Sequence, residues 1–345
     1  MSKRILVIDD DLMNLKMAEY ILKKNGYEVI SAKSGEESLS ILEKEIPDLI
    51  LLDIEMPGMN GFQLMEILQK CEHKRKIPVI FLTADRSEET EEKCFQMGAV
   101  DYIGKPFVPA IMLQRIRRTI ELEDYRKGLE AMVEAQLQRI TQLQQDIIIT
   151  MANLIESRDG TTGEHVKRTS QYVDVLVNKL IKKNIYKEEL NAELVNCIKK
   201  ATPMHDIGKI TVSDIILQKP GRFTDEEYSI MKSHSLAGRQ LIQENISKMV
   251  DSKFVEVASD IAAYHHEKWN GGGYPEGLKG EEIPLSARIV AIADVFDALV
   301  AKRQYKEGMS PEEAIGIMEK DRGISFEPVL LDVFIEALPE IKEIM

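Results

Sequence analysis

Seven residues in the C-terminal half of the chain have side chains that commonly bind metal ions. They recur roughly every 30 to 40 residues and include two adjacent pairs: His165, His205, Asp206, His234, His265, His266 and Asp294. Imidazoles and carboxylates without a thiolate suit borderline cations such as Fe, Mn, Zn, Ni or Co better than Ca²⁺ or a cysteine-type zinc site. One such histidine is more often structural, but seven candidate ligands favour a shared metal centre.

The adjacent pair His205 and Asp206, in "TPMHDIGKI", indicates more than one ion. Neighbouring side chains on a helix diverge by about 100°, so the pair does not easily chelate one ion, whereas a carboxylate can bridge two. Two ions about 3.5–4 Å apart clamp a phosphodiester during in-line displacement. Lys209 follows one helical turn after His205, where its ammonium would neutralise developing charge. We therefore expect a two-metal hydrolase with Asp206 and Lys209 as catalytic groups.

A second set of polar residues lies near the N-terminus, where each member ends or follows a short apolar run. The set comprises Asp9 and Asp10 after "ILVI", Asp53 after "DLILL", Thr83 after "PVIFL", and Lys105 after "VDYI". Carboxylates of this kind form a hard-oxygen Mg²⁺ site, and one of them can act as a nucleophile. The lysine would balance the charge of a phosphoryl group.

Two kinds of element must position these residues. The apolar runs at 5–8, 27–31, 48–52, 78–82 and 100–103 alternate with stretches of helical spacing, which predicts a doubly wound, five-stranded parallel sheet over 1–120. The carboxyl ends of its strands share one edge. From residue 158 onward the chain reads as an all-α bundle, with capping boxes at Thr224 and Ser310. We expect successive helices to point their ligands at one centre.

Residues 121–157 join the two regions and contain a heptad pattern. The seam comprises Leu122, Arg126, Leu129, Val133, Leu137, Ile140, Gln144, Ile147, Met151 and Leu154. This pattern predicts a coiled-coil linker helix that pairs with a second copy of the chain. The alternative is a single amphipathic helix packed on its own domain.

Composition limits the class of protein. The 345 residues carry a net charge of −13, which disfavours binding to nucleic acid, and no basic helix-turn-helix segment is evident. No apolar run approaches the roughly 18 residues that a membrane span needs, and the N-terminus is unlike a signal peptide. Cys71, Cys94 and Cys197 form no metal or disulfide pattern. We expect a cytoplasmic protein.

The strand-end residues carry a resemblance to response-regulator receiver domains over residues 1–120. The resemblance implies that Asp53 is the phosphoacceptor and that Asp9, Asp10 and Asp53 bind Mg²⁺. It further implies that Thr83 and Lys105 contact the phosphoryl group and that Tyr102 is an aromatic switch. A sensor histidine kinase would be the partner.

The C-terminal region resembles the HD-GYP domains over 147–345, through "ESRDGTTGEH", "HDIGK", "KPGRFTDEEYSIMKSH" and "YHHEKWNGGGYPEGLKGEEIPLSARIVAIADVFDAL". The resemblance implies hydrolysis of cyclic di-GMP to pGpG, or onward to GMP, by two divalent ions, with iron or manganese favoured. It makes the seven residues above the metal ligands and assigns substrate contacts to Lys209, Asp297, Arg303 and Lys306. Two alternatives stay open: another cyclic dinucleotide such as cyclic GMP-AMP, or a weakly active adapter that docks a diguanylate cyclase through the glycine-rich loop.

One position concerns the number of ions. Some HD-GYP members resemble this chain but carry a glutamate four residues before the first histidine, where it helps to bind a third ion. Here that position is Thr161, whose neutral hydroxyl is a poor substitute. The nearby Glu164 and Glu156 are expected to reach the site only after a loop rearrangement. The sequence therefore predicts two ions.

Overall fold

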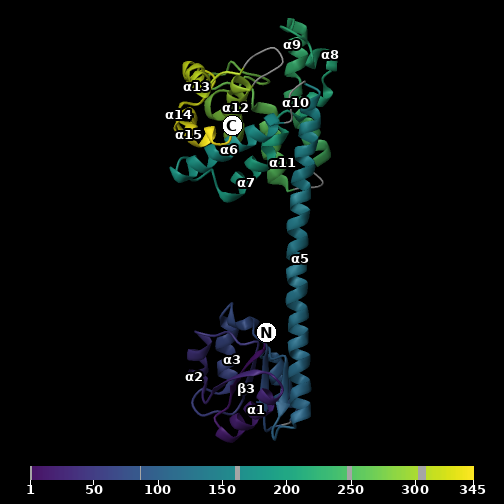
Figure 1. Ribbon diagram of the computed structural model, residues 1–345, viewed down its shortest axis with the longest axis vertical. Coiled ribbons are helices and arrows are strands. Elements are labelled where there is room, and N and C mark those ends of the chain that lie inside the picture. The colour runs from purple at the N-terminus through teal and green to yellow at the C-terminus, as the bar shows by residue number, and fades with distance from the viewer. Residues whose placement is uncertain (1, 86, 160–163, 247–250, 302–307) are drawn as a thin grey trace. The chain divides into compact units, whose positions relative to one another are not determined.

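The computed structural model describes residues 2–85, 87–159, 164–246, 251–301 and 308–345. The chain divides into two compact units, Met1–Leu137 and Gln138–Met345, each with its own hydrophobic clusters. A single helix, α5 (Pro109–Ser157), contributes residues to both units (Figure 1). Among the described helices, none combines the length and the apolar character that crossing a bilayer requires.

The N-terminal unit contains a five-stranded parallel sheet with the strand order β2-β1-β3-β4-β5. Its strands are β1 (Arg4–Ile8), β2 (Glu28–Ala32), β3 (Leu49–Asp53), β4 (Val79–Thr83) and β5 (Asp101–Gly104). This confirms the predicted doubly wound sheet. The strands β2 to β5 each begin one residue later than predicted, which leaves the strand-end polar residues at the same edge.

Helices cover both faces of this sheet (Figure 1). They are α1 (Leu12–Lys24), α2 (Gly35–Leu42), α3 (Gly61–Lys70), the short 3₁₀ turn η1 (Lys74–Lys76), α4 (Glu88–Gln96) and the first turns of α5. Side chains alternate along a strand, so Ile50 and Leu52 join one buried cluster while Leu49 and Leu51 join the other. The first cluster packs under α2, α3 and α4, and the second under α1 and α5.

The C-terminal unit is helical. Its α-helices are α6 (Glu164–Lys182), α7 (Ala192–Ala201), α8 (Asp214–Leu217), α9 (Asp225–Lys232), α10 (His234–Leu241), α11 (Ser252–Tyr264), α12 (Leu285–Val300), α13 (Pro311–Lys320), α14 (Pro328–Glu336) and α15 (Leu338–Lys342). Shorter turns are η2 (Thr202–Met204), η3 (Ile207–Thr211), the π-helical η4 (Ile242–Ile246) and η5 (Gly280–Glu282). Both predicted capping boxes, at Thr224 and Ser310, are present.

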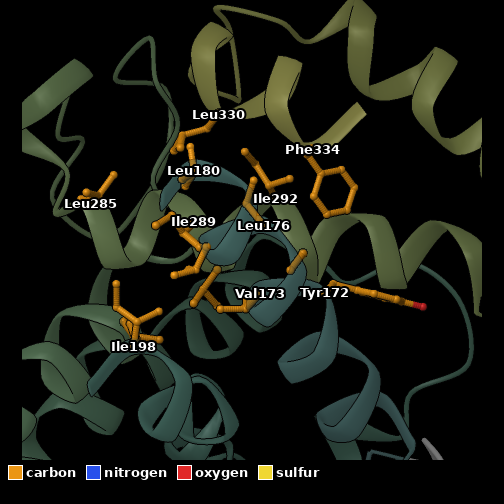
Figure 2. Packing of buried hydrophobic residues seen from close by; sticks show 14 of the residues in the cluster. Tyr172, Val173, Leu176, Leu180, Ile198, Leu285, Ile289, Ile292, Leu330 and Phe334 are labelled. Carbon is orange, nitrogen blue, oxygen red and sulfur yellow. The ribbon is translucent and has the colours of Figure 1, made fainter. Parts of the chain in front are cut away.

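The helix α6 lies at the centre of this unit's core (Figure 2). Val173 and Leu176 on α6 are fully buried and belong to the same cluster as Ile289 and Ile292 of α12 and Phe334 of α14. Burying a large aliphatic side chain contributes about 1.5–3 kcal/mol, so this packing fixes α6 against α12. The same two helices carry His165 and Asp294.

The helix α5 exposes its heptad seam. Each apolar member of the seam is half or more exposed, from 50% for Leu129 to 63% for Leu154. A different face of the last turns packs on the C-terminal unit, where Ala152 and Ile155 are buried. In the described residues the seam is therefore exposed rather than packed on its own domain. Its pairing with a second copy of the chain stays a prediction.

Candidate functional site

The predicted phosphoacceptor site lies at the carboxyl edge of the sheet. Asp9 follows β1, Asp53 ends β3, and Lys105 follows β5. The ammonium of Lys105 is 2.7 Å from Asp9 Oδ2 and 2.6 Å from Asp53 Oδ2. Carboxylate oxygens of Asp9, Asp10 and Asp53 all lie within 4.8 Å of one another. These oxygens are suited to a hard cation such as Mg²⁺.

Burial shapes the charges at this edge. Burial raises the pKa of Asp53 to about 6, although the hydrogen bond from Lys105 opposes the shift. Burial also disfavours the charge of Lys105, but Asp53 and Asp9 outweigh it and raise the Lys105 pKa. The charge of Lys105 therefore depends on the two carboxylates, and the charge of Asp53 depends on Lys105.

Thr83, the predicted phosphoryl contact, and Tyr102, the predicted aromatic switch, lie on the neighbouring strands β4 and β5. Asp53 pairs with Leu82 in the ladder, which places Thr83 beside it. The Thr83 hydroxyl donates to the carbonyl of Asp85 at 2.9 Å and accepts from its amide at 3.0 Å. Tyr102 of β5 lies edge-on to Phe95, with Arg115 over its ring.

In the helical unit, His205 and Asp206 lie between the 3₁₀ turns η2 and η3. The sequence analysis placed them on a regular helix, which is wrong. The reason is a close backbone contact: a Cβ on Gly208 would lie 1.8 Å from the carbonyl oxygen of His234. A glycine therefore lets η3 approach α10, and this contact brings the pair beside His234.

The remaining ligand candidates lie mostly where helices begin or end. His234 is the first residue of α10, after the helix that Thr224 caps, α9, has ended at Lys232. His265 caps α11 and His266 follows it. His165 is the second residue of α6, whereas Asp294 lies within α12.

These side chains converge into two groups that share Asp206. Donor atoms within 4.8 Å of one another define one group of Asp206, His234, His265 and His266, and another of Glu156, His165, His205 and Asp206. Asp294 adjoins the second group, with Oδ1 at 3.5 Å from Nε2 of His165 and 3.8 Å from Nε2 of His205. The structure thus brings together all seven predicted ligands, with Asp206 between the two groups.

Hydrogen bonds orient four of the imidazole rings. In each ring Nδ1 faces an oxygen that can only accept, so Nδ1 carries the proton and Nε2 keeps its lone pair. The partners are Asp297 for His165 (2.7 Å), the carbonyl of Thr202 for His205 (3.0 Å), the carbonyl of Met231 for His234 (2.6 Å) and the carbonyl of Ile261 for His265 (2.9 Å). This is the tautomer that binds metal through Nε2.

Several buried donor atoms fit divalent cations. Within the part of the chain that the structure describes, Asp206 Oδ1, His234 Nε2 and His265 Nε2 are buried and make no hydrogen bond of good geometry. The two nitrogens face Asp206 Oδ1 at 3.3 and 3.7 Å. The Nε2 atoms of His165 and His205 face each other at 3.4 Å. Buried polar atoms are rarely left unsatisfied, and a cation at each group would satisfy them.

The charges of the cluster support the same conclusion. Burial alone would raise the pKa of Asp206, but Lys209 and His205 hold it well below its usual range. Burial opposes protonation of His205, yet Asp206 and the other nearby carboxylates raise its pKa to about 10. The surrounding anions thus favour positive charge on His205, and a bound cation would take the place of that proton.

The predicted substrate contacts have different positions. Lys209 reaches the site, with Nζ at 2.8 Å from both Asp206 Oδ2 and Asp159 Oδ2, and these carboxylates overcome burial to raise its pKa. Asp297 instead is fully buried and accepts hydrogen bonds from His165 and Arg168, so it has no exposed surface for a substrate. Asp297 was expected to contact the substrate, but its position instead suits it to orient the His165 ring. Arg303, Lys306 and Thr161 lie outside the described residues.

Glu156 is a site residue that the sequence analysis set aside. It was expected to need a loop rearrangement, but α5 continues to Ser157 and places Glu156 Oε1 at 3.6 Å from His165 Nε2 without one. A signal existed in the sequence. No glycine or proline interrupts the chain between 129 and 157, and helical spacing puts Glu156 on the same face as Ala152.

Comparisons with known proteins agree with this arrangement. Residues 5–117 match the response regulator receiver domain and residues 149–330 match the HD domain. A probable cyclic di-GMP phosphodiesterase of Vibrio cholerae is 39% identical over 340 residues, covering 96% of this chain and 77% of that protein. The cyclic di-GMP phosphodiesterase response regulator RpfG of Xanthomonas campestris is 32% identical over 349 residues, which cover 99% of this chain and 89% of that protein. The 3'3'-cGAMP-specific phosphodiesterase 2 of Vibrio cholerae is 37% identical over 220 residues, which cover 64% of this chain and 40% of that protein.

The receiver fold and the histidine-rich cluster define a response regulator with a metal-dependent hydrolase as its output. The chain belongs to the response regulators that join a receiver domain to an HD-type cyclic dinucleotide phosphodiesterase domain.

Proposed function

We propose that this response regulator hydrolyses cyclic di-GMP to linear pGpG at a binuclear metal centre, under the control of phosphorylation at Asp53. The observation that carries the proposal is the pair of ligand groups that share Asp206. Iron or manganese at these groups would be consistent with their mixture of imidazole and carboxylate ligands.

The chain's own residues have distinct tasks in this reaction. Bound divalent ions supply Lewis acid activation of a water and of the phosphodiester. Asp206 faces both groups and holds their relative positions. Lys209 lies against Asp206, and its ammonium is placed to offset the charge that develops on the phosphate oxygens. Asp297 keeps the proton of His165 on Nδ1 and so directs its lone pair inward.

Aromatic and cationic groups next to the cluster support a nucleotide substrate. Tyr274, in the glycine-rich loop, has its ring centroid 4.8 Å from that of His266 and 6.3 Å from that of Tyr228. The ammonium of Lys232 lies 6.0 Å from the Tyr274 ring. Nucleobases stack on such rings and phosphates pair with such cations, so we assign this wall to the substrate. Arg303 and Lys306 complete the proposed phosphate contacts.

Product analysis tests this function. Protein purified without oxygen is assayed for metal content and incubated with cyclic di-GMP, and products are separated by chromatography. We expect about two transition-metal ions per chain and accumulation of pGpG that chelator abolishes. Unchanged cyclic di-GMP in the presence of a fully loaded metal centre would overturn the proposal.

A second candidate substrate is cyclic GMP-AMP. The observation that favours it is the similarity of this chain to a phosphodiesterase named as specific for 3'3'-cGAMP. Parallel turnover of the two nucleotides discriminates them, and at least a tenfold higher kcat/KM for cyclic GMP-AMP would reassign the substrate.

Control by phosphorylation is the second half of the proposal, with a sensor histidine kinase as the phosphodonor. We expect the signal to pass through α5 as a change in homodimer packing, because this helix contains residues of both units and exposes its seam. The glycine-rich loop remains a proposed docking site for a diguanylate cyclase.

Beryllofluoride, a phosphoryl mimic, tests this control. At saturating Mg²⁺ it should change the rate of hydrolysis several-fold in the native protein and leave Asp53→Ala unchanged, because only the native chain has the acceptor carboxylate. Equal rates with and without the mimic in the native protein would count against the coupling.

A further inference from the structure

Glu156 lies in the last turn of α5, and only 2% of its surface is exposed. Its carboxylate is grouped with the donor atoms of His165, His205 and Asp206, all within 4.8 Å of one another. We propose that Glu156 is a ligand of a divalent cation at this group, a role that rests on the metal centre of the proposed function. The linker helix would thus supply part of the metal centre.

The charges around Glu156 support this role. Glu156 and Asp206 are two buried carboxylates in one group, and burying each charge is expensive unless it is compensated. When Nε2 binds a metal, His165 and His205 are neutral ligands that bring no charge of their own, and both direct Nε2 toward the group. Lys209 contacts Asp206 and Asp159. A divalent cation at the point where these donors converge would compensate both carboxylates together.

Contacts of the residues on either side of Glu156 hold the end of α5 in place. Arg158 donates to Asp214 Oδ1 at 2.7 Å and to the carbonyl of Val212 at 3.1 Å. Asp159 accepts from Lys209 at 2.8 Å, and Ile155 is buried in the C-terminal unit. A ligand held by a rigid element in this way is positioned before the ion arrives.

Glu156 also makes the two metal positions chemically different. Its group has two carboxylates and two imidazoles, with Asp294 nearby, whereas the other group has one carboxylate and three imidazoles. Oxygen-rich sites suit Mn²⁺ better, and nitrogen-rich sites suit Zn²⁺, Ni²⁺ and iron. We therefore expect the position at Glu156 to be the one that prefers the harder ion.

A manganese titration tests the proposal. The full-length chain is stripped with chelator and titrated with Mn²⁺ alone, and free Mn²⁺ is followed by electron paramagnetic resonance. Glu156→Gln should weaken one class of Mn²⁺ site by about 10- to 100-fold, because it removes a charged ligand while keeping the shape of the side chain. Glu134→Gln, on the exposed part of the same helix, should match the native titration. A folded Glu156→Gln protein with native affinity and stoichiometry would overturn the proposal.

Anomalous scattering decides the matter if Glu156→Gln does not fold. In crystals of the native protein soaked with Mn²⁺, the Glu156 carboxylate should contact a manganese peak directly, and a carboxylate outside every coordination sphere would refute the role. Neither measurement uses turnover. A failure to hydrolyse cyclic di-GMP would therefore leave this result standing, and the two proposals can fail separately.

Discussion

The two candidate metal sites hold their ligands by different means. At the sheet edge, carboxylates are set by the ends of β1 and β3, and one ammonium, Lys105, links Asp9 to Asp53. In the helical unit, four imidazoles each use one ring nitrogen for a hydrogen bond that aims the other inward. Oriented imidazoles suit transition metals, whereas carboxylate oxygens suit Mg²⁺. We therefore expect the helical site to keep its ions and the sheet-edge site to exchange Mg²⁺.

The strongest challenge to this comparison is Asp206→Ala. It removes the carboxylate shared by both ligand groups, so we expect loss of most bound metal and a fall in kcat of more than about 1,000-fold. Metal analysis, circular dichroism and turnover are measured together, with Asp53→Ala as the control that should leave metal in the helical unit unchanged. Near-native turnover of the chelator-treated variant would show that Asp206 holds no essential metal.

Orientation of the imidazoles is tested by Asp297→Asn. The amide can no longer fix the His165 proton as a carboxylate does, so metal affinity or kcat should fall by about 10- to 100-fold while KM changes little. Asp332→Asn, at an exposed pair with Arg322, is the matched control. If the two variants behave alike, Asp297 does not orient a ligand.

The smallest effect concerns the stability of the receiver. The pKa of Asp53 is raised from 3.8 to about 6, so its protonated form stabilises the fold below about pH 4 and this contribution is lost as the pH rises through 6. Without Mg²⁺, Asp53→Asn should therefore be more stable than the native chain at pH 7.5, by about 1–2 kcal/mol, and the difference should close near pH 4. Scanning calorimetry in EDTA measures this, and an Asn variant that is less stable at both pH values would contradict it.

The receiver site was largely predictable because short-range patterns define it. Each apolar run gave a strand to within one residue, and Asp9, Asp53 and Thr83 lie at the ends of those strands. In a parallel sheet the carboxyl ends meet at one edge, so neighbours in space follow from neighbours in sequence. The environment of Asp53, including its raised pKa, depended on burial and could not be read from the pattern.

The helical site was predictable in its ligands and less so in its geometry. Helical spacing does not record that Gly208 lets η3 approach α10, so His205 and Asp206 were assigned to a helix. Contacts between distant segments were also missed. Asp297 meets His165 across 132 residues of sequence, and Glu156 reaches the cluster because the last turns of α5 belong to the same compact unit as α6. Such contacts depend on tertiary packing, which a single sequence does not reveal.

The continuity of α5 has a consequence for domain fusions. The packing of Ala152 and Ile155 fixes the rotation of its last turns, while Leu154 and the rest of the seam remain exposed. One inserted residue turns the preceding helix by about 100°, whereas seven return it to within about 20°. A foreign sensor fused to this helix must therefore join it at the same rotation about the helix axis. Chimaeras whose linker lengths differ by seven residues should show the same signalling behaviour.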